Sequence, residues 1–309
     1  MRSLRARRLS LGSGLLLALA LVALAVTGLG AGGLRAGGVP GWRVGEVAQV
    51  ALPLSVSERG TISARGDQLA RRLGLPGLAA TTTRALDRTL ALAVDTVELV
   101  GPDGRLAAVL TRDTTSGRLR SAVRLAWTAE LDLPRLDAAG AIDAARRFLA
   151  AADWPAPSAT PLSDWDDGMG AWRVRWPRLI SGVAAPTDGL VAWIHRGGQL
   201  KALAIKESPL APAPTATISP EVALASVRGY LQRTGIAGMA GLTILAPVLR
   251  WAEANDFVDP SLPDAPAPAL RLAWVVHLSY LPPGWSERHE VELAVDAGTG
   301  ELIGGTESA

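Results

Sequence analysis

The clearest alternation of apolar and polar residues lies near the C-terminus, between residues 270 and 305. Three runs rich in β-branched and apolar residues are separated by Pro282-Pro283-Gly284 and by the sequence Asp-Ala-Gly-Thr-Gly at 296–300. Turn-forming residues between such runs predict a three-stranded meander. Because aspartate bonds to nearby backbone and glycine tolerates positive φ, we interpret Asp296, Gly298 and Gly300 as structural turn residues.

A helix followed by strands is predicted twice before that meander ends. Asp137 can cap a helix that runs to about residue 151, and strands follow at 171–177, 189–195 and 200–206. Ser219, with Pro220 at the first helical position, begins a second helix that runs to about residue 233. Both helices therefore precede a predicted antiparallel sheet.

The two predicted blocks match each other at fixed spacings. The helical segment 136–149 aligns without a gap on 218–231, with similar residues at corresponding positions. The motif Ala-Trp-x-Val at Ala171 recurs at Ala273. The later copy is longer between its helix and this strand, and the extra length is attributed to 253–268. Long-period similarity of this kind indicates repeated supersecondary units.

An earlier segment, 36–135, is predicted to be an N-terminal α+β module. It has a modest helical pattern at 64–73 and strand patterns at 90–100, 105–112 and 118–129. Val97-Glu98-Leu99 is similar to Val291-Glu292-Leu293, which suggests that this module belongs to the same series. The expected organisation is thus 36–135, 136–207, a Pro-rich linker at 208–217, and 218–309.

The first 35 residues predict a signal anchor or a signal peptide. Four arginines up to Arg8 precede an uncharged run that extends from position 9 to position 34 and ends before Arg35. A run of this length can span a bilayer, and the arginines predict an N-in, C-out orientation. Gly28-Leu29-Gly30 could also serve as a cleavage site. We favour an uncleaved anchor through residues 9–34, with the remainder outside the cytoplasmic membrane, and a secreted protein if the segment is cleaved.

Composition narrows the class of protein further. The chain has 309 residues, 49% of them apolar, which is enough for a sizeable core. It has no cysteine, so disulfides, thiolate metal sites and cysteine nucleophiles are excluded. Without the four N-terminal arginines, the acidic side chains outnumber the basic ones, so the positive formal charge of +2 gives no support to nucleic-acid binding.

Motifs of common enzyme chemistry are absent from the sequence. The three histidines, His195, His277 and His289, include no HExxH frame, and there is no Gly-x-Ser-x-Gly elbow or Walker loop. The acidic run at 164–168 lacks the spacing of a calcium loop and is interpreted as a turn. We therefore expect no catalytic residues, no metal and no cofactor, while a hydrolase that uses Asp, Glu and His stays an alternative.

Tryptophan is unusually frequent among the aromatic residues, because the chain has ten tryptophans but only two tyrosines and two phenylalanines. Those at strand positions, such as Trp172 and Trp274, are expected in the core. Trp165 and Trp285 fall in predicted loops, where an exposed aromatic ring can anchor a partner. His289 is interpreted either as a solvated hairpin edge or as a pH-sensitive contact. Trp165, Trp285 and His289 are the candidate partner-contacting residues.

Three motifs resemble the PepSY domain family: the capped helix start at 219–223 (SPEVA), the strand at 273–276 (AWVV) and the hairpin at 295–302 (VDAGTGEL). The resemblance covers 218–305 well and 136–206 moderately. It implies small α+β units found outside the cytoplasmic membrane, in protease propeptides, spore-germination proteins and membrane-anchored regulators of sensor kinases. The middle block departs from the pattern, because its turn at 195–199 has neither the aspartate nor the threonine.

Together these observations predict an α+β fold of tandem PepSY-like units, each a helix packed on a curled antiparallel sheet, behind one N-terminal apolar helix. The function we expect is a non-catalytic, membrane-anchored binding or regulatory protein that contacts another envelope protein, such as a sensor kinase ectodomain. The alternative is a propeptide-like inhibitor or chaperone of a secreted protease.

Overall fold

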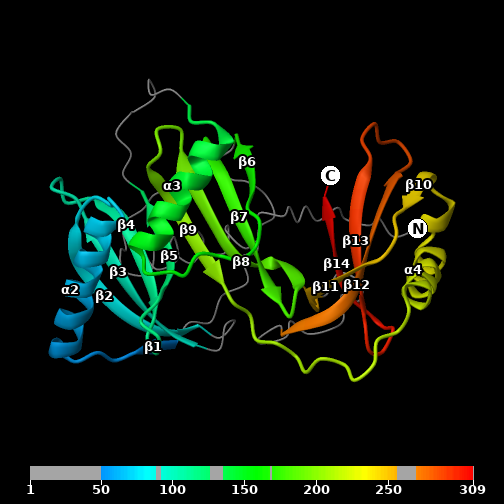
Figure 1. The fold of residues 1–309 in the computed structure, drawn as a ribbon, viewed down its shortest axis with the longest axis horizontal. Coiled ribbons are helices and arrows are strands. Elements are labelled where there is room, and N and C mark those ends of the chain that lie inside the picture. The colour runs from blue at the N-terminus through cyan, green and yellow to red at the C-terminus, as the bar shows by residue number, and fades with distance from the viewer. Residues whose placement is uncertain (1–49, 88–91, 126–134, 168, 256–268, 309) are drawn as a thin grey trace. The chain divides into compact units, whose positions relative to one another are not determined.

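A computed structural model describes residues 50–87, 92–125, 135–167, 169–255 and 269–308 (Figure 1). These residues form mainly antiparallel strands with three α-helices. The helices are α2 (Val56–Arg72), α3 (Ala138–Ala151) and α4 (Pro220–Thr234), and a short 3-10 helix, η1 (Ile236–Gly238), follows α4. The strands are β1 (Val50–Leu52), β2 (Leu78–Asp87), β3 (Leu92–Val100), β4 (Leu106–Asp113), β5 (Leu119–Arg124), β6 (Leu162–Asp166), β7 (Ala171–Ile180), β8 (Val183–His195), β9 (Leu200–Lys206), β10 (Ala240–Ile244), β11 (Val248–Glu253), β12 (Leu270–Leu281), β13 (His289–Asp296) and β14 (Leu302–Ser308).

The expected fold class is wrong, because the first two blocks do not have separate sheets. Their strands join into one nine-stranded sheet in the order β1-β2-β3-β4-β5-β9-β8-β7-β6. The junction is the antiparallel pair β5–β9, where Ser121 lies opposite Ala204 and Val123 opposite Ala202. Pairing two strands that would otherwise be exposed edges satisfies their backbone groups, which is the physical reason for the merger. The N-terminal helix of the predicted fold lies outside the described residues.

One face of the nine-stranded sheet packs against both α2 and α3. A single core contains Leu69 of α2, Leu149 of α3 and inward-facing strand residues such as Leu110. Helix α2 crosses β3 at very short range, since a Cβ on Gly66 would lie 2.8 Å from a methyl carbon of Val97. Only glycine allows the helix to approach the strand this closely.

The C-terminal block has a sheet of its own. Strand β12 pairs with β13 on one side and with both β10 and β11 on the other, and β14 follows β13. Helix α4 packs on this sheet through Val227 and Leu231, which share a core with Leu278 and Leu293. The helix ends at Gly235, whose φ of 79° is the left-handed conformation that commonly terminates helices.

The described residues divide into two compact units. One contains the residues before 178 together with Asp188–Glu207, and the other contains Arg178–Thr187 and the residues from 208 onward. In the second unit the indole nitrogen of Trp251 donates to the carbonyl of Ile180 at 3.4 Å, and Leu210 of the predicted linker forms a parallel bridge with Leu270. Pro214 of the same linker packs on Gly298, so the linker lies along its unit.

Helices α3 and α4 begin in the same way, at positions that the sequence repeat pairs. The indole of Trp172 donates to the carbonyl of Leu136 at 2.8 Å, and the indole of Trp274 donates to the carbonyl of Ile218 at 3.0 Å. Each carbonyl belongs to the residue before the helix cap. The amide nitrogens of the same two residues donate to the second residue of the following hairpin turn, Arg196 at 3.0 Å and Ala297 at 2.7 Å respectively. We call this arrangement the helix clip.

A second local motif relates the first block to the last, in the turns that follow β4 and β13. Asp113 Oδ1 accepts from the amides two and three residues later at 2.8 and 2.9 Å, and Asp296 Oδ1 does the same at 2.8 and 3.0 Å. The amide of Gly117 donates to the carbonyl of Asp113, as that of Gly300 does to Asp296. We call this arrangement the carboxylate turn.

Asn255 bonds to the outer side of β14. The amide group of Asn255 donates to the carbonyl of Gly305 at 2.9 Å and accepts from its nitrogen at 3.0 Å. A Cβ on Gly304 would lie only 2.6 Å from the Asn255 side-chain oxygen. Asn255 thus bonds to the strand as a neighbouring strand residue would.

Within the described ranges no helix has both the length and the apolar character needed to cross a membrane. The predicted anchor, residues 9–34, lies outside those ranges.

Candidate partner-binding pocket

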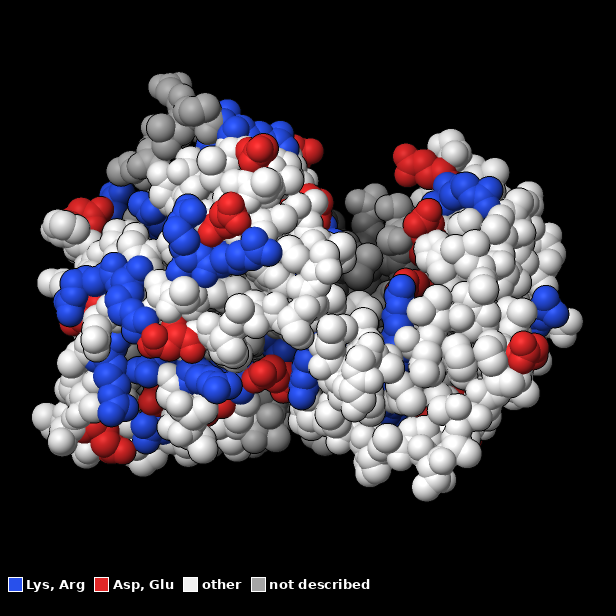
Figure 2. All heavy atoms as spheres, in the orientation of Figure 1, with Lys and Arg blue, Asp and Glu red and all other residues white. Residues whose placement is uncertain are grey.

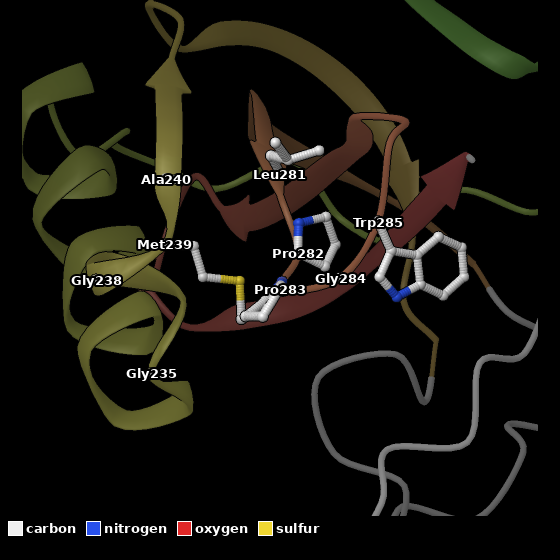
Figure 3. Close-up of a pocket in the computed structure, with 9 residues that line it drawn as sticks. All are labelled: Gly235, Gly238, Met239, Ala240, Leu281, Pro282, Pro283, Gly284 and Trp285. Atoms are coloured by element: carbon white, nitrogen blue, oxygen red, sulfur yellow. The ribbon is translucent and has the colours of Figure 1, made fainter.

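The C-terminal unit has an apolar hollow beside the turn that joins β12 to β13 (Figure 3). Its volume is about 500 Å³, and no charged side chain lines it. The lining residues come from the end of α4, from η1, from the start of β10 and from the turn; they are Gly235, Gly238, Met239, Ala240, Leu281, Pro282, Pro283, Gly284 and Trp285. We call this hollow the Trp285 pocket.

Local sequence explains the shape of the pocket. Pro282 and Pro283 cannot extend the strand pairing, since proline lacks an amide donor, and Gly284 turns the chain at a φ of 82°. The amide of Trp285 then donates to the carbonyl of Pro282 at 3.1 Å. Opposite the turn, Met239 leaves η1 and its side chain reaches toward Pro283 (Figure 3).

Trp285 is held in place although it is 48% exposed. Its ring meets that of His289 edge to face, with centroids 4.7 Å apart and planes at 88°. The His289 ring in turn lies 5.8 Å from that of Tyr280, and these two residues are 9% and 8% exposed. Because the His289 ring packs against it, the Trp285 indole loses little conformational freedom when a partner binds. This favours Trp285 as a contact residue.

The structure therefore brings together two of the three residues proposed as partner contacts, Trp285 and His289, and gives them different positions. Trp285 faces solvent, whereas His289 is the first residue of β13 and lies beneath the indole. Neither His289 nor Glu290 lines the pocket, and no carboxylate does. The other two histidines do not line the pocket either. His277 Nε2 lies 3.9 Å from Glu290 Oε2, and His195 Nδ1 lies 3.3 Å from Gln199 Oε1 in the β8–β9 turn.

Trp165, the third proposed contact, belongs to the nine-stranded sheet, and its ring contacts residues of the same unit. Its indole nitrogen donates to Asp167 at 2.8 Å, and its ring meets Trp172 edge to face at 5.8 Å. The guanidinium of Arg135 lies 3.8 Å from the centre of the Trp165 ring. A stacked cation and a second indole leave this tryptophan less available to a partner than Trp285 is.

The predicted turn residues Asp296, Gly298 and Gly300 all lie in the carboxylate turn, but glycine is required at position 298 for a reason other than the one predicted. Gly300 has a φ of 79°, as a turn glycine should, but Gly298 does not lie in the left-handed region. A Cβ on Gly298 would lie 2.8 Å from Pro214 Cβ, so close packing against the linker requires glycine there. The second oxygen of Asp296 lies 3.5 Å from Arg271.

Sequence reasoning missed Met239 and treated Pro282 and Pro283 only as turn formers. The sequence did contain a signal for the prolines, because Pro-Pro-Gly followed by tryptophan places apolar groups at an exposed turn. It contained no signal for Met239, which falls between predicted elements. The segment 253–268, to which the extra length of the later copy is attributed, lies outside the described residues except for its first three positions. Within the described chain no group of three or more His, Asp and Glu side chains could hold a metal ion.

Comparisons with known proteins leave the family open. No family model matches the chain, and no curated protein matches it. Among solved structures it is similar to the Bacillus megaterium YpeB C-terminal domain, with 12% sequence identity and a TM-score of 0.46 over 83% of this chain and 98% of that chain. We draw no argument from a similarity at this level. The PepSY resemblance therefore stays a prediction.

Proposed function

We propose that this protein is a non-catalytic binding module that holds another envelope protein through the Trp285 pocket. The observation that carries the proposal is the position of Trp285, which is 48% exposed at an apolar hollow and supported by the buried ring of His289. Aromatic side chains that are rigid and exposed are the commonest energetic anchors of protein interfaces.

The lining of the pocket defines the kind of partner. Proline, methionine, leucine and tryptophan side chains offer apolar contact, and no charged group is available to recognise an ionic ligand. Methionine adapts its shape to different apolar surfaces. The occupant we propose is an uncharged apolar segment of a second protein.

The location of the module is part of the proposal. The uncharged run that follows Arg8 supports a tether through residues 9–34, with the folded units outside the cytoplasmic membrane. A sensor kinase ectodomain or a secreted protease would be accessible to a module tethered in that way.

Photo-crosslinking in living cells tests the proposal. A photoreactive amino acid placed at Pro283, which is exposed and lines the pocket, should give a covalent adduct with one envelope protein. Adding Trp285→Ala should abolish the adduct, whereas adding Trp165→Ala should leave it intact, because Trp165 contacts its own unit. The identity of the adduct then distinguishes a kinase regulator from a protease inhibitor.

Two results would refute the proposal. One is the absence of any protein adduct at position 283 in a chain that is exported and folded. The other is an adduct whose yield is the same with and without Trp285→Ala.

A further inference from the structure

The side of α2 that faces α3 carries two arginines, of which one has no ion pair within the described chain. Arg65 and Arg72 are two helical turns apart and therefore lie on the same side of the helix. Arg72 donates to Asp153, just after the end of α3, at 2.6 and 2.7 Å, so this side of α2 is turned toward α3. Arg65 lies on the same side, is exposed and forms no hydrogen bond or ion pair within the described chain.

Arg112 rises from the sheet on the face that the helices cover. It follows Leu110 by two positions in β4, and Leu110 is buried in the core beneath the helices. Alternate residues of a strand share a face, so Arg112 points to the side on which α2 lies. Burial and the positive charge of Arg65 lower the pKa of Arg112 and outweigh the negative charge of Asp95, which raises it. The effect of Arg65 agrees with two guanidinium groups lying close together.

Neighbouring acids neutralise this pair only in part. Asp95 lies directly opposite Arg112 in the β3–β4 register, but both of its oxygens accept from Arg84, at 2.7 and 3.2 Å. Glu58 is likewise engaged by Arg84 at 3.2 Å. Arg84 thus engages both of these acids. Within the described chain neither Arg65 nor Arg112 forms an ion pair with a carboxylate, although the negative charge of Asp95 still attracts Arg112.

Arg112 is already oriented for binding. Its Nε and Nη2 atoms donate to the carbonyl of Gly117 at 2.9 and 2.5 Å, which fixes the guanidinium plane, while Nη1 forms no hydrogen bond within the described chain. Figure 2 shows that Lys and Arg side chains gather over the part of this unit that carries α2.

We propose that Arg65 and Arg112 bind a phosphate group. A guanidinium matches the spacing of phosphate oxygens, and two of them match the charge of a phosphate better than that of a single carboxylate. The phosphate could be free in solution or belong to a lipid headgroup, and the two sources share this chemistry.

Calorimetric titration of the full chain in detergent micelles tests the site, with inorganic phosphate as the first probe and glycerophosphoglycerol, a phosphodiester headgroup, as the second. At least one probe should bind, and Arg65→Gln and Arg112→Gln should each weaken its affinity roughly tenfold. Arg105→Gln is the matched control, because it removes the same charge from a side chain that is 87% exposed in the β3–β4 turn. It should bind as the unchanged chain does.

The two probes separate the sources. Tighter binding of the phosphodiester supports a lipid headgroup, and tighter binding of inorganic phosphate supports a free phosphate. The proposal is refuted if neither probe binds, or if Arg65→Gln, which alters an exposed side chain and should leave the fold intact, binds both as well as Arg105→Gln does. Equal loss of binding in Arg105→Gln would also refute it, since the effect would then be one of overall charge.

Discussion

The start of α3 and the start of α4 share the helix clip, yet the hairpin turns that close the two clips differ. After β13 the turn contains the carboxylate of Asp296, which bonds two amides. After β8 the corresponding position is His195, and this turn has no carboxylate. It is closed by backbone bonds from the His195 amide to Gln199 and from Gly198 to His195, and the His195 and Gln199 side chains form a hydrogen bond at 3.3 Å. The clip therefore does not depend on the carboxylate.

The first block shows the converse combination. Its turn after β4 has the carboxylate of Asp113, but among the described residues no tryptophan bonds to the residue before its helix cap. The carbonyl of that residue, Leu54, instead accepts from the guanidinium of Arg59 at 3.1 and 3.3 Å. The indole clip and the carboxylate turn are thus separate devices, and within the described ranges only the C-terminal block has both.

The largest effects should come from removing the indole donors. Trp172→Phe and Trp274→Phe each leave a carbonyl without its partner, so we expect the free energy of unfolding to fall by about 2 kcal/mol. The loss should be greater for Trp172, because its block has no carboxylate turn. Urea unfolding curves measure both. A loss no larger than that of Trp285→Phe, whose ring is exposed, would contradict the structural role of the clip.

The next largest losses of stability should come from removing the carboxylates of the two carboxylate turns. Asp113→Ala deletes two amide bonds and an ion pair with Arg120 at 3.1 Å, and Asp113 is only 8% exposed. We expect a loss of about 2 kcal/mol for Asp113→Ala and about 1 kcal/mol for Asp296→Ala. Asp143→Ala, at a side chain of α3 that is 63% exposed, is the control and should change stability by less than about 0.5 kcal/mol. Equal losses at Asp113 and Asp143 would disprove the comparison.

Acid should weaken the first block through the same carboxylate. Burial raises the pKa of Asp113, but hydrogen bonds from the amide of Ser116, from Arg120 and from the amide of Thr115 outweigh it and hold the pKa below its ordinary value. A lowered pKa in the folded state stabilises the protein fully above the unfolded value of about 3.9, and this contribution disappears as pH falls further. Denaturation curves between neutral pH and about pH 2 should therefore depend less on pH in Asp113→Asn than in the unchanged chain.

Substitutions at the helix caps should give the smallest losses of stability. Ser55 and Glu58 form a reciprocal capping box, with the Ser55 amide donating to Glu58 at 2.9 Å, whereas Ser219 accepts one bond from Val222 at 3.4 Å. We expect the free energy of unfolding to fall by about 1 kcal/mol in Ser55→Ala and by about 0.5 kcal/mol in Ser219→Ala. Thermal unfolding of the two variants measures the difference, and a larger effect at Ser219 would show that the box adds nothing.

Helices and long strands could be predicted from the sequence because their signals are local. Asp137, Ser219 and the apolar alternation of β12 and β13 place those elements within a few residues of their observed bounds. Strand β2 was missed, since its threonine-rich sequence has no apolar alternation. The carboxylate turn of the first block could have been recognised, because DTTSGRL at 113–119 is similar to DAGTGEL at 296–302.

The joining of two sheets could not be predicted, because the β5–β9 pair brings together strand edges that are distant in the sequence, and the local pattern carries no signal for such a pairing. The candidate pocket was half predictable for a similar reason. Trp285 stands out in the sequence as an aromatic residue in a turn, but the support from His289 and the opposite wall at Met239 arise only when β10, β12 and β13 come together.

Asn255 sets a limit on how this molecule can polymerise. An open strand at the end of a sheet invites a second chain to continue the ladder, which is a common first step toward fibrils. The Asn255 amide occupies the donor and acceptor of Gly305 that such a chain would use. The backbone amide of Asn255 donates to Ile303 of the same strand as well. Asn255 thus blocks self-templated growth at the middle of this edge, where other sheets use lysine or proline.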